Sequence, residues 1–133
     1  MRISLSMLFG AAIVAGLAIP TAAFADGDAA RGAKVFKKCA ACHTATEAKN
    51  KVGPHLVGII DRPMASVEDY KYSNAMIEHA AEQPTWTVEA LEAYLHKPKD
   101  VVKGTKMAFA GLKKDDEIEN VIAYLTDPAA AEK

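Results

Sequence analysis

Five consecutive residues, Cys39-Ala40-Ala41-Cys42-His43, constrain this chain more than any other feature, because they contain its only two cysteines. The cysteines and the histidine stand at i, i+3 and i+4, so one helical turn places all three on a single face. Two thiols held in this way can each add across a vinyl group of a porphyrin, while the imidazole reaches its iron from the same side. The motif is typical of c-type haem attachment. It predicts one haem c, covalently bound through Cys39 and Cys42, with His43 as an iron ligand.

Paired cysteines at this spacing also occur in dithiol redox proteins, in structural disulfides and in zinc sites. A thioredoxin-like dithiol would stand in a βαβ pattern, and the sequence contains none. A zinc site would need a second pair of ligands, whereas the other histidines, His55, His79 and His96, are not paired. Haem attachment therefore explains the motif best, and a periplasmic dithiol protein is the non-haem alternative.

The first 25 residues have the layout of a secretory signal peptide. Arg2 is their only charged side chain, residues 7–19 are an uninterrupted run of apolar or small residues, and Pro20 follows that run. The run is shorter than the about 20 residues that a membrane-spanning helix needs. We therefore expect residues 1–25 to be a signal peptide cleaved after Ala25. Residues 26–133 are then expected to form a single domain in an oxidising compartment such as the periplasm.

The composition is that of an ordinary globular domain and excludes several classes of function. Half of the 133 residues are hydrophobic, a quarter are charged, and the formal net charge is −1. Without a basic excess there is no sign of a nucleic-acid surface, and the chain is too short for a multidomain enzyme. Aromatic residues make up only 7% of the chain. A bound haem would supply the middle of a core that has few large side chains of its own.

Hydrophobic periodicity and capping residues predict an all-α fold with large loops. Asp28 is expected to cap a first helix that runs to about Lys38, and a glycine- and proline-containing loop should follow from Thr44 to about Tyr72. Further helices are expected from Ser73 to about Glu82, from Thr87 to Pro98, and from Asp115 onward, where apolar residues recur at helical spacing. A second loop is expected from about Lys99 to Lys114.

The second iron ligand must come from elsewhere in the chain, and the residues alone leave it open. Met64, Met76 and Met107 all follow the predicted signal peptide. Met76 falls within an expected helix, where a core methionine is the commoner explanation. Met107 falls in a loop with glycines on both sides that can bend toward a haem, and a soft thioether suits low-spin iron. A methionine in a loop can also simply pack against its neighbours.

An ordered series of motifs makes the chain resemble the class I c-type cytochromes, the group of mitochondrial cytochrome c and bacterial cytochrome c2. The resemblance covers nearly all of residues 27–127. Its motifs, in chain order, are Gly32 with Phe36, Cys39-x-x-Cys42-His43, Gly53-Pro54-x-Leu56, Arg62, Tyr70-Lys71-Tyr72-Ser73, Trp86, Tyr94-Leu95-x-x-Pro98, Gly104-Thr105-Lys106-Met107-x-Phe109-x-Gly111 and Ile122-x-Tyr124-Leu125. The implied fold is a small helical cytochrome c fold, with large loops wrapped around one covalently attached haem.

The resemblance also implies which residues surround the haem. Met107 becomes the expected second iron ligand, opposite His43. The Pro54 carbonyl should accept a hydrogen bond from His43, and Tyr94 should reach Met107 or its surroundings. The expected metal ligands are thus His43 and Met107, and the expected cofactor-binding residues are Cys39, Cys42, His43, Pro54, Arg62, Tyr72, Trp86, Tyr94, Thr105 and Met107.

Two further contacts are implied by the same resemblance. Tyr72, Trp86 and Arg62 should bond the haem propionates, which would otherwise be poorly compensated charges in a small protein. Gly32 and Phe36 should meet Val121 and Tyr124 where the first and last helices cross. The alternatives are that the aromatic residues only pack in the core and that Arg62 is solvated.

The function implied is one-electron transfer and not catalysis, because a haem with both axial positions filled has no open site for oxygen or peroxide. The expected partners are redox proteins: a cytochrome bc1 complex with a terminal oxidase, a photosynthetic reaction centre or a periplasmic dehydrogenase. We expect a soluble monomer that binds no nucleic acid and does not insert stably into a membrane after cleavage. The rival class is a haem enzyme or sensor in which Met107 detaches to admit peroxide or a gas.

Lysines near the haem motifs suggest a basic docking face on an otherwise near-neutral protein. Acidic residues gather instead at 61–69, 78–92 and 115–119. Such an asymmetry steers encounter with charged partners and weakens with salt. The alternative is that the lysines are merely solvated. The lysines concerned are Lys37, Lys38, Lys51, Lys97, Lys99, Lys103, Lys106, Lys113 and Lys114.

Overall fold

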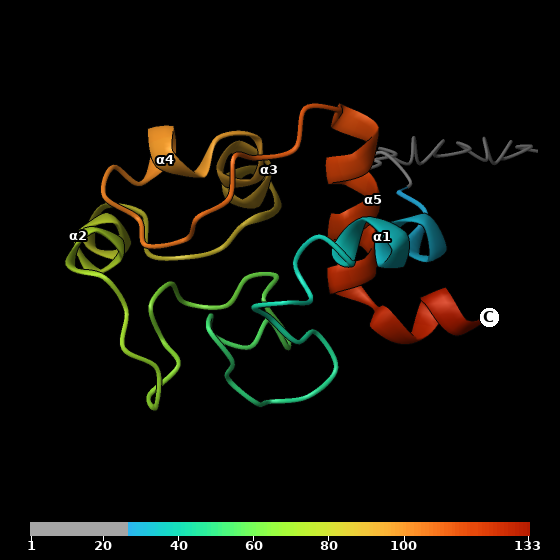
Figure 1. Cartoon of the computed structure of the whole chain (residues 1–133), viewed down its shortest axis with the longest axis horizontal. Coiled ribbons are helices and arrows are strands. Elements are labelled where there is room, and N and C mark those ends of the chain that lie inside the picture. Colours follow the sequence, from blue (N-terminus) through green and yellow to red (C-terminus); the bar gives the residue numbers. More distant parts are fainter. Residues whose placement is uncertain (1–26) are drawn as a thin grey trace, which may run out of the picture.

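The computed structural model describes residues 27–133 (Figure 1). The predicted signal peptide and its cleavage after Ala25 lie outside the described residues. Within them the chain forms α1 (Ala29–Phe36), α2 (Asn74–Glu82), α3 (Val88–His96), α4 (Pro98–Val101), α5 (Asp115–Thr126) and the 3-10 helix η1 (Pro128–Glu132). The described residues contain no strand beyond an isolated bridge between Pro63 and Thr85. The prediction of an all-α fold with large loops is confirmed.

Three helices begin at side chains that cap their first turn. Oδ1 of Asp28 accepts a hydrogen bond from the amide of Arg31 (2.9 Å), which starts α1. Ser73 caps α2 and Thr87 caps α3 in the same way. These caps satisfy amides that have no partner within the helix. The predicted starts of these helices are confirmed, although α1 ends at Phe36 and the chain then continues in turns.

The expected loop between Lys99 and Lys114 is interrupted at its start. Pro98 does end α3, but it also begins the one-turn helix α4, whose last turn is closed by a hydrogen bond from the amide of Val102 to the carbonyl of Pro98 (2.9 Å). A proline at the first helical position has its φ already suited to a helix, and its missing N–H costs nothing there. The prediction was therefore wrong at α4 and correct for the rest of the segment.

The first and last helices pack closely against each other, and Figure 1 shows α1 crossing α5. Gly32 makes this approach possible, because a methyl group at its position would overlap the backbone carbonyl of Asn120. One turn further on, the rings of Phe36 and Tyr124 lie with their centroids 5.2 Å apart. The predicted crossing of these two helices is confirmed, and it holds together residues nearly ninety positions apart in the chain.

The remaining elements enclose a space that their own side chains do not fill. The buried hydrophobic residues come mainly from α1, α3, α5 and the long loops, and α2 contributes none that is fully buried. A chain of this size gains stability from burying apolar area around a common centre. Within residues 27–133, no helix is long and apolar enough to cross a membrane.

Candidate functional site

A cavity of about 370 Å³ lies between α1, α2, α3, α5 and the two long loops. Most of the surface that lines it is apolar, with a few polar groups. All ten residues expected to bind the cofactor lie on its wall, although they come from positions spread between 39 and 107. An apolar cavity with a few convergent polar groups is the usual form of a cofactor site.

The two cysteines and His43 lie in turns that continue from α1. The amides of Cys42 and His43 both donate to the carbonyl of Cys39, at 3.0 and 2.9 Å. The bond from His43 spans four residues, as in an α-helix, so the motif has the helical spacing that its sequence predicts. No disulfide joins the two cysteines, and burial raises the pKa of the Cys39 thiol above its ordinary value.

His43 is oriented by the loop that follows it. Its Nδ1 lies 2.7 Å from the carbonyl oxygen of Pro54, so a proton on Nδ1 donates to that carbonyl and leaves Nε2 as the lone-pair nitrogen. Gly53 packs directly against the imidazole, and a methyl group at this position would overlap the ring. Burial lowers the pKa of His43, which favours the neutral imidazole that a metal ion requires.

Met107 lines the cavity from a loop that is attached to α3 through Thr105. Oγ1 of Thr105 accepts a hydrogen bond from the amide of Met107 (3.2 Å) and lies 3.2 Å from the hydroxyl of Tyr94. Tyr94 thus reaches the surroundings of Met107 by way of Thr105. Burial raises the pKa of Tyr94, so its hydroxyl stays protonated.

Arg62 carries an unsatisfied group on the cavity wall. Its Nη1 and Nη2 donate to the carbonyls of Val57 and His55, both at 3.0 Å. Its Nε is buried and has no hydrogen-bond partner among the described residues. Burial lowers the pKa of this guanidinium, which indicates a charge that lacks full compensation. An anionic propionate would supply the missing partner, so the residues present fit a haem.

Tyr72 and Trp86, also expected at the propionates, lie on the same wall in different surroundings. The hydroxyl of Tyr72 accepts a hydrogen bond from the amide of Val67 (3.2 Å), which leaves its own proton to donate to a ligand. Trp86 is buried, and its ring lies 5.1 Å from that of Tyr94. Arg62 is held next to Trp86 by the backbone, because the amide of Trp86 donates to the carbonyl of Arg62 (3.0 Å).

The three methionines occupy different places. Met64 is buried in the core and does not line the cavity. Met76 lines it from α2, a position that its sequence pattern did not reveal, since an apolar residue on a helix faces a core or a cofactor alike. The cavity wall among residues 27–133 therefore includes two thioethers, Met76 and Met107.

Two of the lysines expected on a docking face are bound to backbone carbonyls. Nζ of Lys51 donates to the carbonyl of Ala40, and Nζ of Lys106 donates to that of Lys71. Lys106 also lies over the ring of Tyr70, 4.9 Å from its centroid. No local pattern could have indicated these contacts, because the bonded residues lie 11 and 35 positions apart.

Comparison with known proteins agrees with this geometry. The sequence model of the family described as Cytochrome c matches residues 29–127. Cytochrome c2 of Agrobacterium tumefaciens (strain II Chrys) is 48% identical over 107 residues, covering 80% of this chain and 96% of that protein. Cytochrome c-550 of Ancylobacter novellus is 52% identical over 97 residues, covering 72% and 91%. The solved structure of cytochrome cH from Methylobacterium extorquens matches with a TM-score of 0.68 at 38% identity, over 74% of this chain and 97% of that one.

Proposed function

This chain belongs to the cytochrome c family, whose members are electron carriers with one covalent haem c, and we propose that His43 and Met107 are its two iron ligands. The observation that carries the proposal is that two hydrogen-bonded loops, one with His43 and one with Met107, line the same cavity. His43 is fixed through Pro54, and Met107 is fixed through Thr105 and Tyr94.

Fixed ligands suit a carrier and not an enzyme. The bound haem supplies a reversible one-electron couple at its iron. The protein chain holds both ligands in place, surrounds the iron with apolar side chains and leaves no coordination position open for a substrate. Methionine ligation and an apolar pocket raise the reduction potential. Arg62, Tyr72 and Trp86 are proposed to hold the propionates from the other edge of the cavity.

Replacing Met107 by alanine tests the ligand assignment. The covalent haem should remain, because Cys39 and Cys42 are unchanged. The near-infrared absorption band of ferric His/Met haem should disappear, and the reduction potential should fall. Met64→Leu and Met76→Leu are the matched controls and should keep the band. A band that survives in Met107→Ala and disappears in Met76→Leu would identify Met76 as the ligand.

The rival function, a haem enzyme or gas sensor, differs in how readily Met107 leaves the iron and opens a coordination position. The neighbours of Met107 in the chain, from Thr105 to Phe109, also line the cavity wall, and the Lys106 ammonium group is bonded to the carbonyl of Lys71. We therefore expect the reduced holoprotein to bind no carbon monoxide at neutral pH. Prompt binding of carbon monoxide by the unmodified protein would favour the sensor or enzyme.

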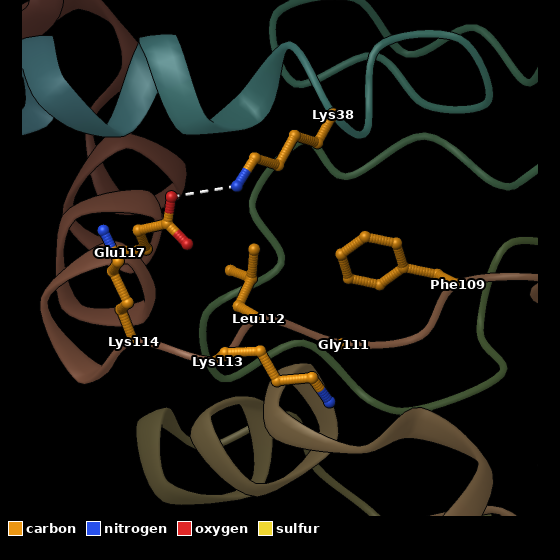
Figure 2. Close-up of a pocket in the computed structure, with 7 residues that line it drawn as sticks. All are labelled: Lys38, Phe109, Gly111, Leu112, Lys113, Lys114 and Glu117. Carbon is orange, nitrogen blue, oxygen red and sulfur yellow. Dashed lines mark hydrogen bonds and ion pairs between the residues drawn. The ribbon is translucent and has the colours of Figure 1, made fainter.

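Electron exchange is proposed to take place beside Phe109. A second, shallower pocket of about 350 Å³ opens there on the surface, lined by Lys38, Phe109, Gly111, Leu112, Lys113, Lys114 and Glu117 (Figure 2). Phe109 lines both this pocket and the haem cavity. Lys38 also lines both, so a partner seated on the pocket would be separated from the cavity by these two side chains.

Charges around the surface pocket favour an acidic partner, but less simply than the sequence suggested. Lys38 is paired with Glu117 at 2.9 Å, as Figure 2 shows, so acidic residues are not confined to the opposite face. Lys113 and Lys114 are exposed and form no ion pair within the described residues. These two lysines are therefore the proposed docking charges, since a charge that is already paired attracts a partner less.

An anionic oxidant tests this docking charge. Lys113→Glu should slow oxidation of the reduced protein by ferricyanide and weaken the dependence of the rate on ionic strength. Lys34→Glu changes the net charge equally on the exposed side of α1 and should have the smaller effect. Equal effects of the two variants would mean that only net charge matters.

The compartment and the partners are proposed from the sequence together with the bacterial relatives. We place the protein in the periplasm after cleavage behind Ala25, as a monomer. It would there accept electrons from a cytochrome bc1 complex or a periplasmic dehydrogenase and pass them to a terminal oxidase or a reaction centre. Mass spectrometry of the exported protein should find Asp26 as its first residue and the mass of one haem added. An uncleaved product would contradict the cleavage.

A further inference from the structure

Lys51 has a position that electron-carrier function and docking do not explain. Its Nζ donates to the carbonyl oxygen of Ala40, which lies between the two haem-attaching cysteines. No backbone amide among the described residues donates to that carbonyl. Carbonyls at the end of a helical segment lack partners within it, and a lysine side chain can satisfy them. Lys51 thus caps the turn that carries Cys39, Cys42 and His43.

The backbone around Lys51 is fixed to the same turn. The amide of Lys51 donates to the carbonyl of Gly53 (2.9 Å), and the amide of Gly53 donates to the carbonyl of Cys42 (2.8 Å). The next residue, Pro54, accepts the hydrogen bond from His43. Residues 51–54 therefore orient the imidazole and, at the same time, hold the ammonium group of Lys51 beside the attachment turn.

We propose that Lys51 is a positioning residue of the haem site, which caps the attachment turn and keeps a positive charge beside it, so that the reduction potential of the iron is raised. The proposal rests on the haem-carrier function above. Oxidation adds one positive charge at the iron, and a cation held nearby makes that addition less favourable.

A docking lysine would behave differently. Its ammonium group would form no bond within the protein, and its replacement would alter encounter with a partner while the isolated protein stayed the same. Lys49 supplies this comparison within the chain, because it is exposed two residues away and its side chain makes no hydrogen bond or ion pair among the described residues. Lys49→Met therefore removes the same charge without removing the cap.

The test uses the holoproteins of Lys51→Met, Lys51→Arg and Lys49→Met, with the reduction potential measured by voltammetry and amide exchange by NMR. Lys51→Met should have a lower potential than Lys49→Met, and Lys51→Arg should restore it. The amides of His43 and Gly53 should exchange about twofold to tenfold faster in Lys51→Met, the range expected for one lost hydrogen bond. A potential or an exchange rate equal to that of Lys49→Met would overturn the proposal. Absence of a reversible one-electron wave in the unmodified protein would instead overturn the carrier function.

Discussion

The hydroxyl of Tyr94 and the hydroxyl of Thr105 lie 3.2 Å apart, and this contact joins α3 to the loop that carries Met107. Oγ1 of Thr105 also accepts the amide of Met107. One small side chain therefore satisfies two polar groups in a half-buried place. Because a hydroxyl has one proton and two lone pairs, Thr105 can make both bonds at once.

Thr105→Val should loosen the Met107 loop, because it removes the hydroxyl and leaves the Met107 amide and Tyr94 without their partner. We expect a loss of about 1–3 kcal/mol in the free energy that holds the loop in place. In the ferric holoprotein the near-infrared band should therefore disappear at a lower denaturant concentration. Thr105→Ser keeps the hydroxyl and should stay close to the unmodified protein. If Thr105→Val and Thr105→Ser lost the band at the same denaturant concentration, the hydroxyl would not be what holds the loop.

Gly32→Ala should separate α1 from α5. The added methyl group would overlap the backbone carbonyl of Asn120, which cannot move away by a change of rotamer as a side chain could. Overpacking of this kind costs about 1–3 kcal/mol, more than the up to about 1 kcal/mol that alanine gains as a helix former. The Gly32→Ala holoprotein should unfold at a lower urea concentration than the unmodified holoprotein. For Lys34→Ala, on the exposed side of α1, the free energy of unfolding should change by no more than about 0.5 kcal/mol. An unchanged midpoint for Gly32→Ala would contradict the close packing.

Removal of the haem should leave the chain largely unfolded. The helices surround a cavity of about 370 Å³ that their own side chains do not fill, and α2 has no fully buried residue. A group that binds only the folded chain stabilises it by mass action, so the haem-free protein loses that contribution. Near-ultraviolet circular dichroism of Trp86, which is buried, should collapse in the apoprotein. A native-like spectrum without haem would show that the chain supports its own core.

Local signals predicted most of the helices, since caps and apolar spacing act within a few residues. Asp28, Ser73 and Thr87 each cap the helix expected after them. The spacing of the haem-attachment motif likewise determined its geometry, because an i to i+4 bond is local. Two short helices were missed, α4 and the 3-10 helix η1, and each begins with a proline. Pro98 was interpreted only as a terminator, whereas a proline can also occupy the first position of a new helix.

Contacts between distant segments could not be predicted in this way. The bonds of Lys51 and Lys106 to backbone carbonyls depend on where two loops meet, and lysine patterns in a sequence suggest solvent or a partner. Met76 was taken for a core residue because its helical pattern does not distinguish a core from a cofactor. The unsatisfied Nε of Arg62 is a property of the assembled wall alone.

Lys103 occupies a position in the Met107 loop where proline would fit better. The amide of Thr105 donates to the carbonyl of Val102 (3.0 Å), so residues 102–105 form a turn, and Gly104 has a φ of 91°. Lys103 itself has a negative φ, since the positive values outside glycine belong to Asp61 and Ala65. A positive φ at the third residue alone describes a type II turn, whose second position favours proline.

Lys103→Pro should therefore stabilise the loop that holds Met107. The amide of Lys103 has no hydrogen-bond partner within residues 27–133, so proline removes no bond. Val102 is extended, with φ −116° and ψ 90°, a conformation that a following proline accepts. A proline that fits its site stabilises by about 0.4–1 kcal/mol, chiefly by restricting the displaced loop.

Since 1.36 kcal/mol corresponds to one pH unit, Met107 should leave the ferric iron of Lys103→Pro at a pH about 0.3–0.7 units higher. The control is Lys103→Ala, because proline also deletes an amine that could itself bind the iron, and alkaline titration of the near-infrared band compares the two. Equal midpoints in the proline and alanine variants would mean that residue 103 acts only through its amine, and that the turn does not limit the release of Met107.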